Sequence, residues 1–371
     1  MNKGPGMILF GTRPEAIKVA TVIRAFHQRY GPKSIHVCCS GQHRELMADT
    51  TQSINIPIDV NFDLISQGLD PEILSSRIMV RTQMEIELVS PRWIMVHGDT
   101  ATTLGGANAG YFSHVDVIHL EAGLRTNDLE SPWPEEGIRQ AVSRITDLHL
   151  SSTPEARNNL LSEGTDRDVI RIVGNPGADL IINRNRDVVV RRKRPNNILV
   201  TIHRRENQGD SLEQIIAALE KILETEQGYV ISFIGHPSPD LKARISQLSG
   251  YFSPDIQRRF FVHEPLPYQE FIFLLEQASM VITDSGGLQE EAALLGIPCV
   301  IARKNTERPE IVELGLARIG GTTTARLVEV SLQMLAHLPT GENISTWRTL
   351  QGNGNAGDKV VTEIMNYYGQ Y

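Results

Sequence analysis

Short apolar runs alternate with helix-forming stretches along almost the whole chain. A first series comprises Met7–Phe10, Ile35–Cys39, Trp93–Val96, Val115–Leu120, Leu148–Leu150 and Val169–Val173, and a second comprises Ile198–Ile202, Val230–Ile234, Phe260–Val262, Val281–Thr283 and Cys299–Ala302. Strands that alternate with helices form parallel sheets covered by helices on both faces. A polar stretch, residues 183–197, separates the two series. We therefore predict an α/β protein of two doubly wound, Rossmann-like domains, with the functional site in the cleft between them.

The charge balance and the cysteine content narrow the class of protein. The 371 residues include 36 basic and 44 acidic side chains, a net charge of −8, which argues against a nucleic-acid partner. The basic run Arg191–Arg194 lies among polar residues and is interpreted as a solvated linker. Three cysteines make no disulfide framework, and no apolar segment reaches the roughly 18 residues of a membrane span. These features predict a soluble, cytoplasmic protein with no membrane partner.

The turn from Thr283 to Glu291 has the composition of a phosphate-binding site. An apolar strand precedes it, Ser285 is a good helix N-cap, and Gly286 and Gly287 let a ligand approach the backbone. The N-terminus of the following helix presents N–H groups and a positive dipole end, which suit a diphosphate. We expect Glu291 on the first turn of this helix, where its carboxylate can accept hydrogen bonds from a ribose. A capped helix without a ligand is the alternative interpretation.

A similar pattern of strand, glycine turn and helix lies near the N-terminus, at Gly11–Lys18. Pro14 suits the first position of a helix. Arg13 then precedes the helix and Lys18 lies a little over one turn inside it, so both cations can reach one anion at the helix N-terminus. Two solvated surface cations are the alternative.

Acidic residues follow the ends of predicted strands. Asp99 follows His97-Gly98, Glu121 comes directly after Leu120, and Glu135 lies in a proline-rich loop before a helix. Because the carboxyl ends of parallel strands share one edge of the sheet, we expect the three acids to converge and to serve general acid and base catalysis. For Asp99 alone, capping of the next helix is an equally good interpretation.

In the second half, basic residues follow the strand ends. His203 ends a predicted strand and can titrate near neutral pH, although such a histidine is more often structural. Arg204 and Arg205 supply anion contacts or a helix-end network, and Arg303 and the loop Thr306–Glu310 add further cations. Acids and histidines lack metal-ligand spacing, and no Gly-x-Gly-x-x-Gly or Gly-Lys-Thr/Ser phosphate loop occurs. We therefore predict no metal site.

Eight motifs occur along the chain in a characteristic order. They are Gly-Thr-Arg-Pro-Glu-Ala-Ile-Lys (11–18), Gln-His-Arg-Glu (42–45), His-Gly-Asp-Thr (97–100), Glu-Ala-Gly-Leu-Arg-Thr (121–126), Ser-Pro-Trp-Pro-Glu-Glu (131–136), His-Arg-Arg-Glu-Asn (203–207), Thr-Asp-Ser-Gly-Gly-Leu-Gln-Glu-Glu-Ala (283–292) and Glu-Arg-Pro-Glu (307–310). With these motifs the chain resembles the non-hydrolysing UDP-N-acetylglucosamine 2-epimerases over most of its length.

The resemblance implies a GT-B fold with an active site between two domains. The N-terminal domain is expected at residues 1–182, the nucleotide-binding C-terminal domain at residues 183–354, and a final helix, about residues 355–371, should pack back on the first domain. The resemblance also implies a homodimer, a UDP-sugar substrate and no cofactor.

Matching positions imply roles for individual residues. The catalytic residues would be Asp99, Glu121, Glu135 and His203. The UDP-sugar would be bound by Arg13, Lys18, His43, Leu266, Phe271, Ser285, Gly286, Gly287, Glu291 and Arg308, with Leu266 and Phe271 beside the uracil.

The implied reaction is reversible epimerisation at carbon 2 of UDP-N-acetylglucosamine, through elimination and re-addition of UDP via 2-acetamidoglucal. The proton on carbon 2 becomes acidic only when the anomeric bond breaks with oxocarbenium character, and fixed cations stabilise the departing UDP. The alternatives are a GT-B glycosyltransferase, a hydrolysing 2-epimerase that releases N-acetylmannosamine and UDP, and a non-enzymatic nucleotide-sugar sensor.

Some positions depart from the family pattern. Ile138 stands where relatives usually have asparagine, Gly174-Asn175-Pro176 replaces Gly-Asn-Thr, His236-Pro237-Ser238-Pro239 replaces His-x-Asn-Pro, and the tail motif becomes residues 352–358. These departures leave the catalytic acids unchanged but put the exact sugar in doubt, and a modified UDP-sugar stays open as the substrate.

Bacterial relatives are often activated by their own substrate at a second site. The residues that would match this possible allosteric site are Gln42, Glu135, Arg204 and His236, together with an Arg-Gln pair of which Gln67 is kept. Ser66 stands where the arginine of that pair would fall. We therefore expect activation to be weak or absent in this chain.

Overall fold

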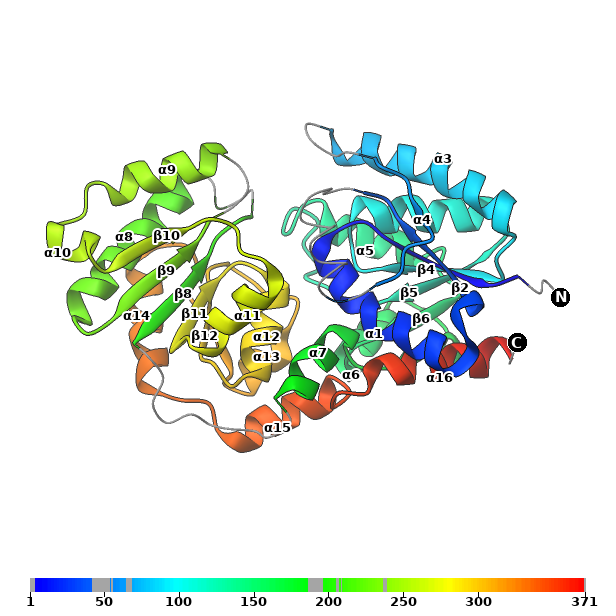
Figure 1. The fold of residues 1–371 in the computed structure, drawn as a ribbon. Coiled ribbons are helices and arrows are strands. Elements are labelled where there is room, and N and C mark those ends of the chain that lie inside the picture. The colour runs from blue at the N-terminus through cyan, green and yellow to red at the C-terminus, as the bar shows by residue number, and fades with distance from the viewer. Residues whose placement is uncertain are drawn as a thin grey trace. The chain divides into compact units, whose positions relative to one another are not determined.

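Two compact units make up the chain in a computed structural model that describes residues 4–41, 54, 56–64, 69–185, 196–204, 207, 209–235 and 239–369. Met1–Arg184 and Arg348–Tyr371 form the first unit, and Asn185–Trp347 form the second. Each unit has a parallel sheet with helices on both faces (Figure 1).

The first unit contains a seven-stranded parallel sheet in the order β3-β2-β1-β4-β5-β6-β7. Its strands are β1 (Gly6–Phe10), β2 (Ile35–Cys39), β3 (Val60–Asn61), β4 (Trp93–His97), β5 (Asp116–Leu120), β6 (Leu148–Ser151) and β7 (Ile170–Ile172). Its helices are α1 (Arg13–Tyr30), η1 (Pro32–Ser34), α3 (Pro71–Val89), α4 (Ala101–Phe112), α5 (Glu135–Ser143), α6 (Pro154–Ser162), η2 (Arg167–Val169), α7 (Pro176–Arg184) and α16 (Ala356–Tyr368).

The second unit contains a six-stranded parallel sheet in the order β10-β9-β8-β11-β12-β13. Its strands are β8 (Asn197–Thr201), β9 (Val230–Ile234), β10 (Phe260–His263), β11 (Met280–Thr283), β12 (Cys299–Ile301) and β13 (Ala317–Ile319). Its helices are α8 (Asp210–Thr225), α9 (Pro239–Ser249), α10 (Pro254–Gln257), α11 (Tyr268–Glu276), α12 (Gly286–Leu294), α13 (Pro309–Glu313) and α14 (Thr324–Ala336). The chain returns to the first unit within α15 (Gly341–Leu350).

The predicted α/β class with two Rossmann-like domains is confirmed. Every predicted strand is present, because buried apolar runs such as Val230–Ile234 leave little choice between strand and helix at this length. The edge strands β3 and β13 were not predicted. They have only two and three residues, too few for a recognisable pattern.

Strand order reverses at one place in each sheet. In the first unit, β1 lies between β2 and β4, and in the second unit β8 lies between β9 and β11. Connections leave such a pair of strands toward opposite faces, which opens a crevice at the carboxyl ends of the two strands. The turns that follow β1 and β4, and those that follow β8 and β11, are therefore the places where a ligand is expected.

Helix α16 packs against α1 in the first unit. Asp179 of α7 caps α16, because its carboxylate accepts hydrogen bonds from the backbone N–H groups of Ala356 and Gly357 at 3.0 and 2.8 Å. A Cβ atom at Gly357 would lie 2.9 Å from Thr21 of α1, so only glycine allows this close approach. Arg29 adds an ion pair to Asp358, with 2.6 Å between Nη2 and Oδ1.

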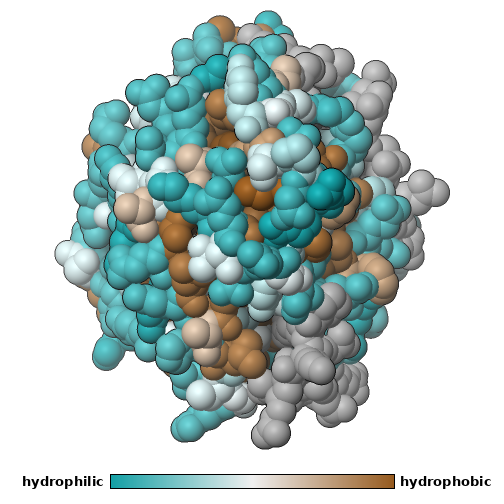
Figure 2. Space-filling model, turned by 90° about the vertical axis from the view of Figure 1, so that its left-hand side faces the viewer, coloured by the Kyte–Doolittle hydropathy of each residue, from teal (hydrophilic) through white to brown (hydrophobic). Residues whose placement is uncertain are grey.

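The face of the second unit drawn in Figure 2 is mostly hydrophilic, with apolar side chains exposed in a strip between polar ones. The buried core of this unit includes Ile198, Val200, Phe233 and Leu219. Among the described residues, none of the helices has both the length and the apolar character needed to cross a membrane.

Candidate active site

Two acids of the first unit lie at the ends of neighbouring strands. β4 and β5 are paired, with His97 opposite Leu120, and the N–H of Gly98 donates to the carbonyl of Leu120 at 2.9 Å. Asp99 comes directly after Gly98, and Glu121 comes directly after Leu120. Gly98 has a φ of 68°, and a Cβ atom there would lie 3.3 Å from Oε2 of Glu121. This turn therefore brings the Glu121 carboxylate close to the backbone beside Asp99.

Glu121 has an unusual backbone conformation and a side chain fixed by an ion pair. Its φ is 66°, in the left-handed region that non-glycine residues rarely adopt, and such residues are concentrated at functional sites. Oε1 forms an ion pair with Nζ of Lys18 from α1, and both side chains are nearly buried, at 11% and 12% exposure. Oε2 lies 3.4 Å from Nε2 of His97. Lys18, predicted to face an anion at a helix N-terminus, thus contacts a predicted catalytic acid.

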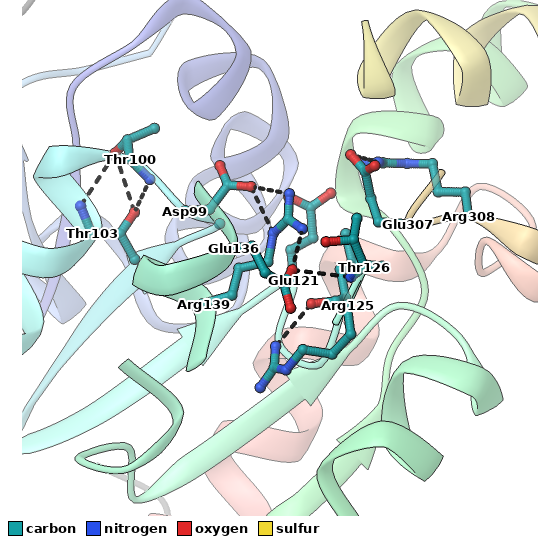
Figure 3. Close-up of polar contacts among 12 residues, drawn as sticks. Asp99, Thr100, Thr103, Glu121, Arg125, Thr126, Glu136, Arg139, Glu307 and Arg308 are labelled. Carbon is teal, nitrogen blue, oxygen red and sulfur yellow. Dashed lines mark hydrogen bonds and ion pairs between the residues drawn. The ribbon is translucent and has the colours of Figure 1, made fainter. Parts of the chain in front are cut away.

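Asp99 is held by Arg139 of α5. Both Nε and Nη2 of Arg139 contact Oδ2 of Asp99, at 2.9 and 2.7 Å (Figure 3). The residue that caps α4 is Thr100, whose hydroxyl accepts a hydrogen bond from the N–H of Thr103 at 3.2 Å. The interpretation of Asp99 as a helix cap is therefore wrong.

Glu135 is the first residue of α5, where a negative charge interacts favourably with the positive end of the helix dipole. Helical spacing of four residues puts Glu135 on the same face of α5 as Arg139, which reaches Asp99. Glu136, its neighbour, is fully buried and accepts hydrogen bonds from the N–H groups of Thr126 and Asn127 and from Arg139 (Figure 3). Glu136 and Arg139 were not predicted as supporting residues, although their spacing of three on one helix was a usable signal.

Three buried histidines lie on adjacent strands beside these acids. Burial lowers the pKa of His97 to about 4, that of His119 to about 4 and that of His149 to about 3. They are therefore uncharged at neutral pH. Nε2 of His119 lies 2.7 Å from the carbonyl oxygen of Gly98, so it donates a hydrogen bond that fixes the turn before Asp99.

The N-terminus of α1 is already occupied by a protein carboxylate. The helix begins at Arg13, so Pro14 takes its second position and not the predicted first. Glu15 is buried and accepts hydrogen bonds from the N–H groups of Gly11 and Thr12 at 2.9 and 2.7 Å, and burial raises its pKa. Thr100, at the start of α4, also donates to Glu15 at 2.7 Å. Glu15 therefore joins the turns that follow β1 and β4.

The predicted phosphate-binding turn of the second unit lies at the N-terminus of α12. Ser285 occupies the N-cap position, and its side chain makes no capping hydrogen bond within the described residues. A Cβ atom at Gly286 would lie 2.4 Å from Nη1 of Arg308, whereas a Cβ atom at Gly287 would have open space around it. Glu291 is the sixth residue of α12 and lies on its second turn. The prediction that Glu291 lies on the first turn is wrong, because with Ser285 as the N-cap the first turn of about four residues ends at Gln289.

Arg308 is 5% exposed and lies between two buried acids. Nε forms an ion pair with Glu290, and Nη1 lies 2.7 Å from Oε1 of Glu307, whose other oxygen lies 2.8 Å from Nη1 of Arg303. This network fixes the Arg308 guanidinium against Gly286. A phosphate bound at the start of α12 would lie beside a pre-oriented cation.

His203 follows β8 and lies beside Asp284, which follows β11. Nδ1 of His203 is 3.0 Å from Oδ1 of Asp284. Arg204 donates from its backbone N–H to the same carboxylate at 2.9 Å. Leu266 lies between β10 and α11, and Phe271 lies on α11, both partly buried. Of the predicted residues, Gln42, His43, Gln67 and His236 lie outside the described residues, as do Arg205 and the run Arg191–Arg194.

Within the part of the chain that the structure describes, no three His, Cys, Asp or Glu side chains are grouped to hold a metal ion. Asp99 and Glu121 each form an ion pair with a cationic side chain, Arg139 and Lys18 respectively. These cations would compete with a metal ion for the two carboxylates.

Comparisons with known proteins agree on one family. Residues 28–365 match the family described as UDP-N-acetylglucosamine 2-epimerase. The chain is 35% identical to a Ralstonia nicotianae protein named a probable UDP-N-acetylglucosamine 2-epimerase, over 98% of this chain and 99% of that protein. It is 32% identical to the UDP-N-acetylglucosamine 2-epimerase of Bacillus subtilis, over 100% of this chain and 97% of that protein.

A solved structure shows the same fold. The UDP-GlcNAc 2-epimerase from Neisseria meningitidis, solved bound to UDP-GlcNAc, superposes with a TM-score of 0.86 at 29% identity, over 98% of this chain and all of that chain. With its two parallel-sheet units, its ordered motifs and these relatives, the chain belongs to the UDP-N-acetylglucosamine 2-epimerase family.

Proposed function

We propose that the protein interconverts UDP-N-acetylglucosamine and UDP-N-acetylmannosamine, or a closely related pair of UDP-sugars, without releasing the free sugar. The observation that carries this proposal is the pair of carboxylates at neighbouring strand ends, Glu121 held by Lys18 and Asp99 held by Arg139. Epimerisation at one carbon needs one group to remove a proton from one face and another to deliver a proton to the opposite face. Two separately fixed carboxylates fit that requirement.

Elimination comes first in the proposed reaction. The bond between carbon 1 and the diphosphate oxygen breaks, and its electron pair leaves with UDP. A carboxylate takes the proton from carbon 2, which gives 2-acetamidoglucal. UDP then adds back at carbon 1 while a proton is delivered to the other face of carbon 2. Atoms and charge balance without a redox partner, and we propose Asp99, Glu121 and Glu135 as the proton-transfer groups.

The second unit holds the nucleotide in this proposal. The hydroxyl of Ser285 and the backbone N–H groups of Gly286 and Gly287 bind the diphosphate, since the start of α12 combines N–H donors, a positive dipole end and the guanidinium of Arg308. Glu291 binds the ribose from the second turn of α12, and Leu266 and Phe271 lie beside the uracil. In the first unit, Arg13, Lys18 and His43 complete the set of substrate-binding residues.

Deuterium exchange tests the proposal and separates it from the alternatives. In deuterated water with UDP-N-acetylglucosamine, NMR should show deuterium at carbon 2 of both epimers of the UDP-sugar, with no added NAD or metal and no accumulation of free UDP. Accumulation of UDP with free N-acetylmannosamine would instead identify a hydrolysing enzyme. Retention of all hydrogen at carbon 2 in an epimerised product, or no reaction until an acceptor is added, would overturn the proposal.

We also propose that the protein is a homodimer through α3. One face of this helix exposes Ile73, Val80, Met84 and Leu88, at 43%, 51%, 54% and 79%. Their spacing of seven, four and four residues forms a single apolar stripe. Arg77 and Glu87 are exposed on the same face, so an antiparallel two-fold axis at the middle of α3 would put Arg77 of one copy opposite Glu87 of the other. A second copy is therefore the partner that fits this stripe.

A further inference from the structure

Asp284 is a buried carboxylate with an unusual number of donors. It is 0% exposed and lies between β11 and the start of α12. The backbone N–H of His203 donates to both carboxylate oxygens at 3.1 Å, the N–H of Arg204 donates at 2.9 Å, and Nδ2 of Asn207 donates at 2.9 Å. Nδ1 of His203 lies 3.0 Å from Oδ1. Four groups thus converge on one carboxylate.

These donors keep Asp284 ionised. Burial alone would favour the neutral acid, but the positive charge of His203 when its ring is protonated, the hydrogen bond of His203, the amide of Asn207 and the N–H of Arg204 outweigh burial and lower the pKa of Asp284 to about 2. An ionised carboxylate can only accept hydrogen bonds. The nitrogen that faces it, Nδ1 of His203, must therefore carry a proton.

The proton on Nδ1 restricts the chemistry of the other ring nitrogen. A neutral histidine has one N–H nitrogen and one acceptor nitrogen, so with Nδ1 protonated Nε2 is the acceptor. When the ring takes up a second proton, that proton resides on Nε2 and the charge is stabilised by Asp284. The side chain of His203 is 41% exposed, so the ring is open to solvent on part of its surface.

We propose that Asp284 is a positioning residue that fixes the tautomer of His203, so that Nε2 alone exchanges a proton with the bound ligand. Because Asp284 is joined directly to Ser285, the same residue also ties His203 to the start of α12. If the start of α12 holds the diphosphate, as the proposed function requires, the ring carries a second proton, on Nε2, when the substrate is bound; Nε2 gives this proton to the diphosphate oxygen as the carbon–oxygen bond breaks, and recovers it when UDP adds back.

A purely structural role for Asp284 makes a different prediction. An amide oxygen can accept the backbone N–H groups of His203 and Arg204 as well as a carboxylate can. Only the contact with Nδ1–H distinguishes the two, because an asparagine side chain can turn its NH₂ group toward the ring and stabilise the opposite tautomer. Asp284→Asn is therefore the informative substitution.

The first experiment measures the tautomer in the absence of substrate. Nitrogen NMR of protein labelled with ¹⁵N-histidine, with the ring of His203 identified by its loss in His203→Gln, should show neutral His203 with its proton on Nδ1. In Asp284→Asn the proton should move to Nε2. Asn207→Ala is the control, because it removes one donor and keeps the carboxylate, so the proton should stay on Nδ1. Wild-type protein with the proton on Nε2 would overturn the proposal even if Asp284→Asn does not fold.

The second experiment measures turnover. Asp284→Asn should lower kcat about 10²–10⁴-fold with little change in KM, whereas Asn207→Ala should change kcat much less. Wild-type turnover in Asp284→Asn, together with a changed tautomer, would overturn the positioning role. If the proposed epimerisation fails but the positioning role is correct, the substrate-free protein should still show the proton of His203 on Nδ1, so the two failures can be told apart.

Discussion

Arg139 contacts one carboxylate oxygen of Asp99 through two guanidinium nitrogens, at 2.9 and 2.7 Å. The third nitrogen of the same group lies 3.0 Å from Glu136, which is fully buried. A planar guanidinium with contacts on two edges cannot rotate without breaking them. The orientation of Asp99 is therefore set by α5, the helix that begins with Glu135. Two of the three proposed proton-transfer groups are thus linked through a single helix.

Removing the ionisable oxygen of each acid should reduce turnover while sparing the nucleotide site. Asp99→Asn, Glu121→Gln and Glu135→Gln are each expected to lower kcat by about a hundredfold or more, because general acid and base groups act in the transition state. UDP affinity, measured by titration calorimetry, should change little. Glu130→Gln, an exposed acid of the loop before α5, is the control. Near-normal turnover in all three variants would show that the catalytic assignment is wrong.

Two neighbouring glycines of α12 should respond differently to a single methyl group. At Gly287 a Cβ atom has open space, so Gly287→Ala should keep or raise stability by up to about 1 kcal/mol through helix propensity. The same methyl would occupy the proposed phosphate position, so UDP affinity should fall about tenfold or more. At Gly286 a Cβ atom meets Arg308 at 2.4 Å, so Gly286→Ala should lower both stability and affinity. Unchanged UDP binding by Gly287→Ala would contradict a phosphate site at this turn.

The sequence predicted the sheets and the strand-end acids for the same physical reason. A buried parallel strand must be apolar along its length, so the first charged residue after it marks the strand end, as Glu121 does after β5. Strands β3 and β13 carry no such signal, since each contributes only two or three residues at a sheet edge.

The partners of the acids could not be predicted in this way. Arg139 contacts Asp99 across 40 positions of the chain, and Asp284 contacts His203 across 81. Such pairings depend on strand order and on the packing of α5, neither of which appears in local spacing. Only the contact between Glu136 and Arg139, three residues apart on one helix, could be recognised from local sequence spacing.

Stability of the first unit should depend on pH through Asp179. Burial raises the pKa of this carboxyl to about 6 from an ordinary value of 3.8. Between about pH 4 and pH 6 the folded protein therefore binds the proton more tightly than the unfolded chain, and the free energy of unfolding falls as pH rises through this window. The decrease attributable to this group is about 2–3 kcal/mol. Urea unfolding from pH 4 to pH 7 should show the free energy of unfolding of the wild type fall by that amount relative to that of Asp179→Asn, and a constant difference between the two proteins would contradict the prediction.

A charge on the apolar stripe of α3 should separate the proposed dimer. Met84→Asp puts a carboxylate at the middle of the stripe, where pairing with a second copy would bury it among apolar side chains and so weaken the pairing. Light scattering coupled to gel filtration should show a dimer for wild type and a monomer for the variant. Leu338→Asp, at an equally exposed apolar residue of the second unit, should stay dimeric. A wild-type protein that is monomeric at micromolar concentration would exclude this surface as a stable interface.

Activation by the substrate should be weak because Ser66 replaces the arginine expected of a second nucleotide site. A guanidinium that contacts a diphosphate contributes about 1.5–3 kcal/mol, so its loss lowers occupancy of that site roughly ten- to a hundredfold. Reactions started from UDP-N-acetylmannosamine should therefore begin without a long lag, with or without trace UDP-N-acetylglucosamine. Ser66→Arg restores the cation beside Gln67 and should introduce a lag that the trace substrate removes. A long lag in the wild-type protein, abolished by trace UDP-N-acetylglucosamine, would show that the second site works without this arginine.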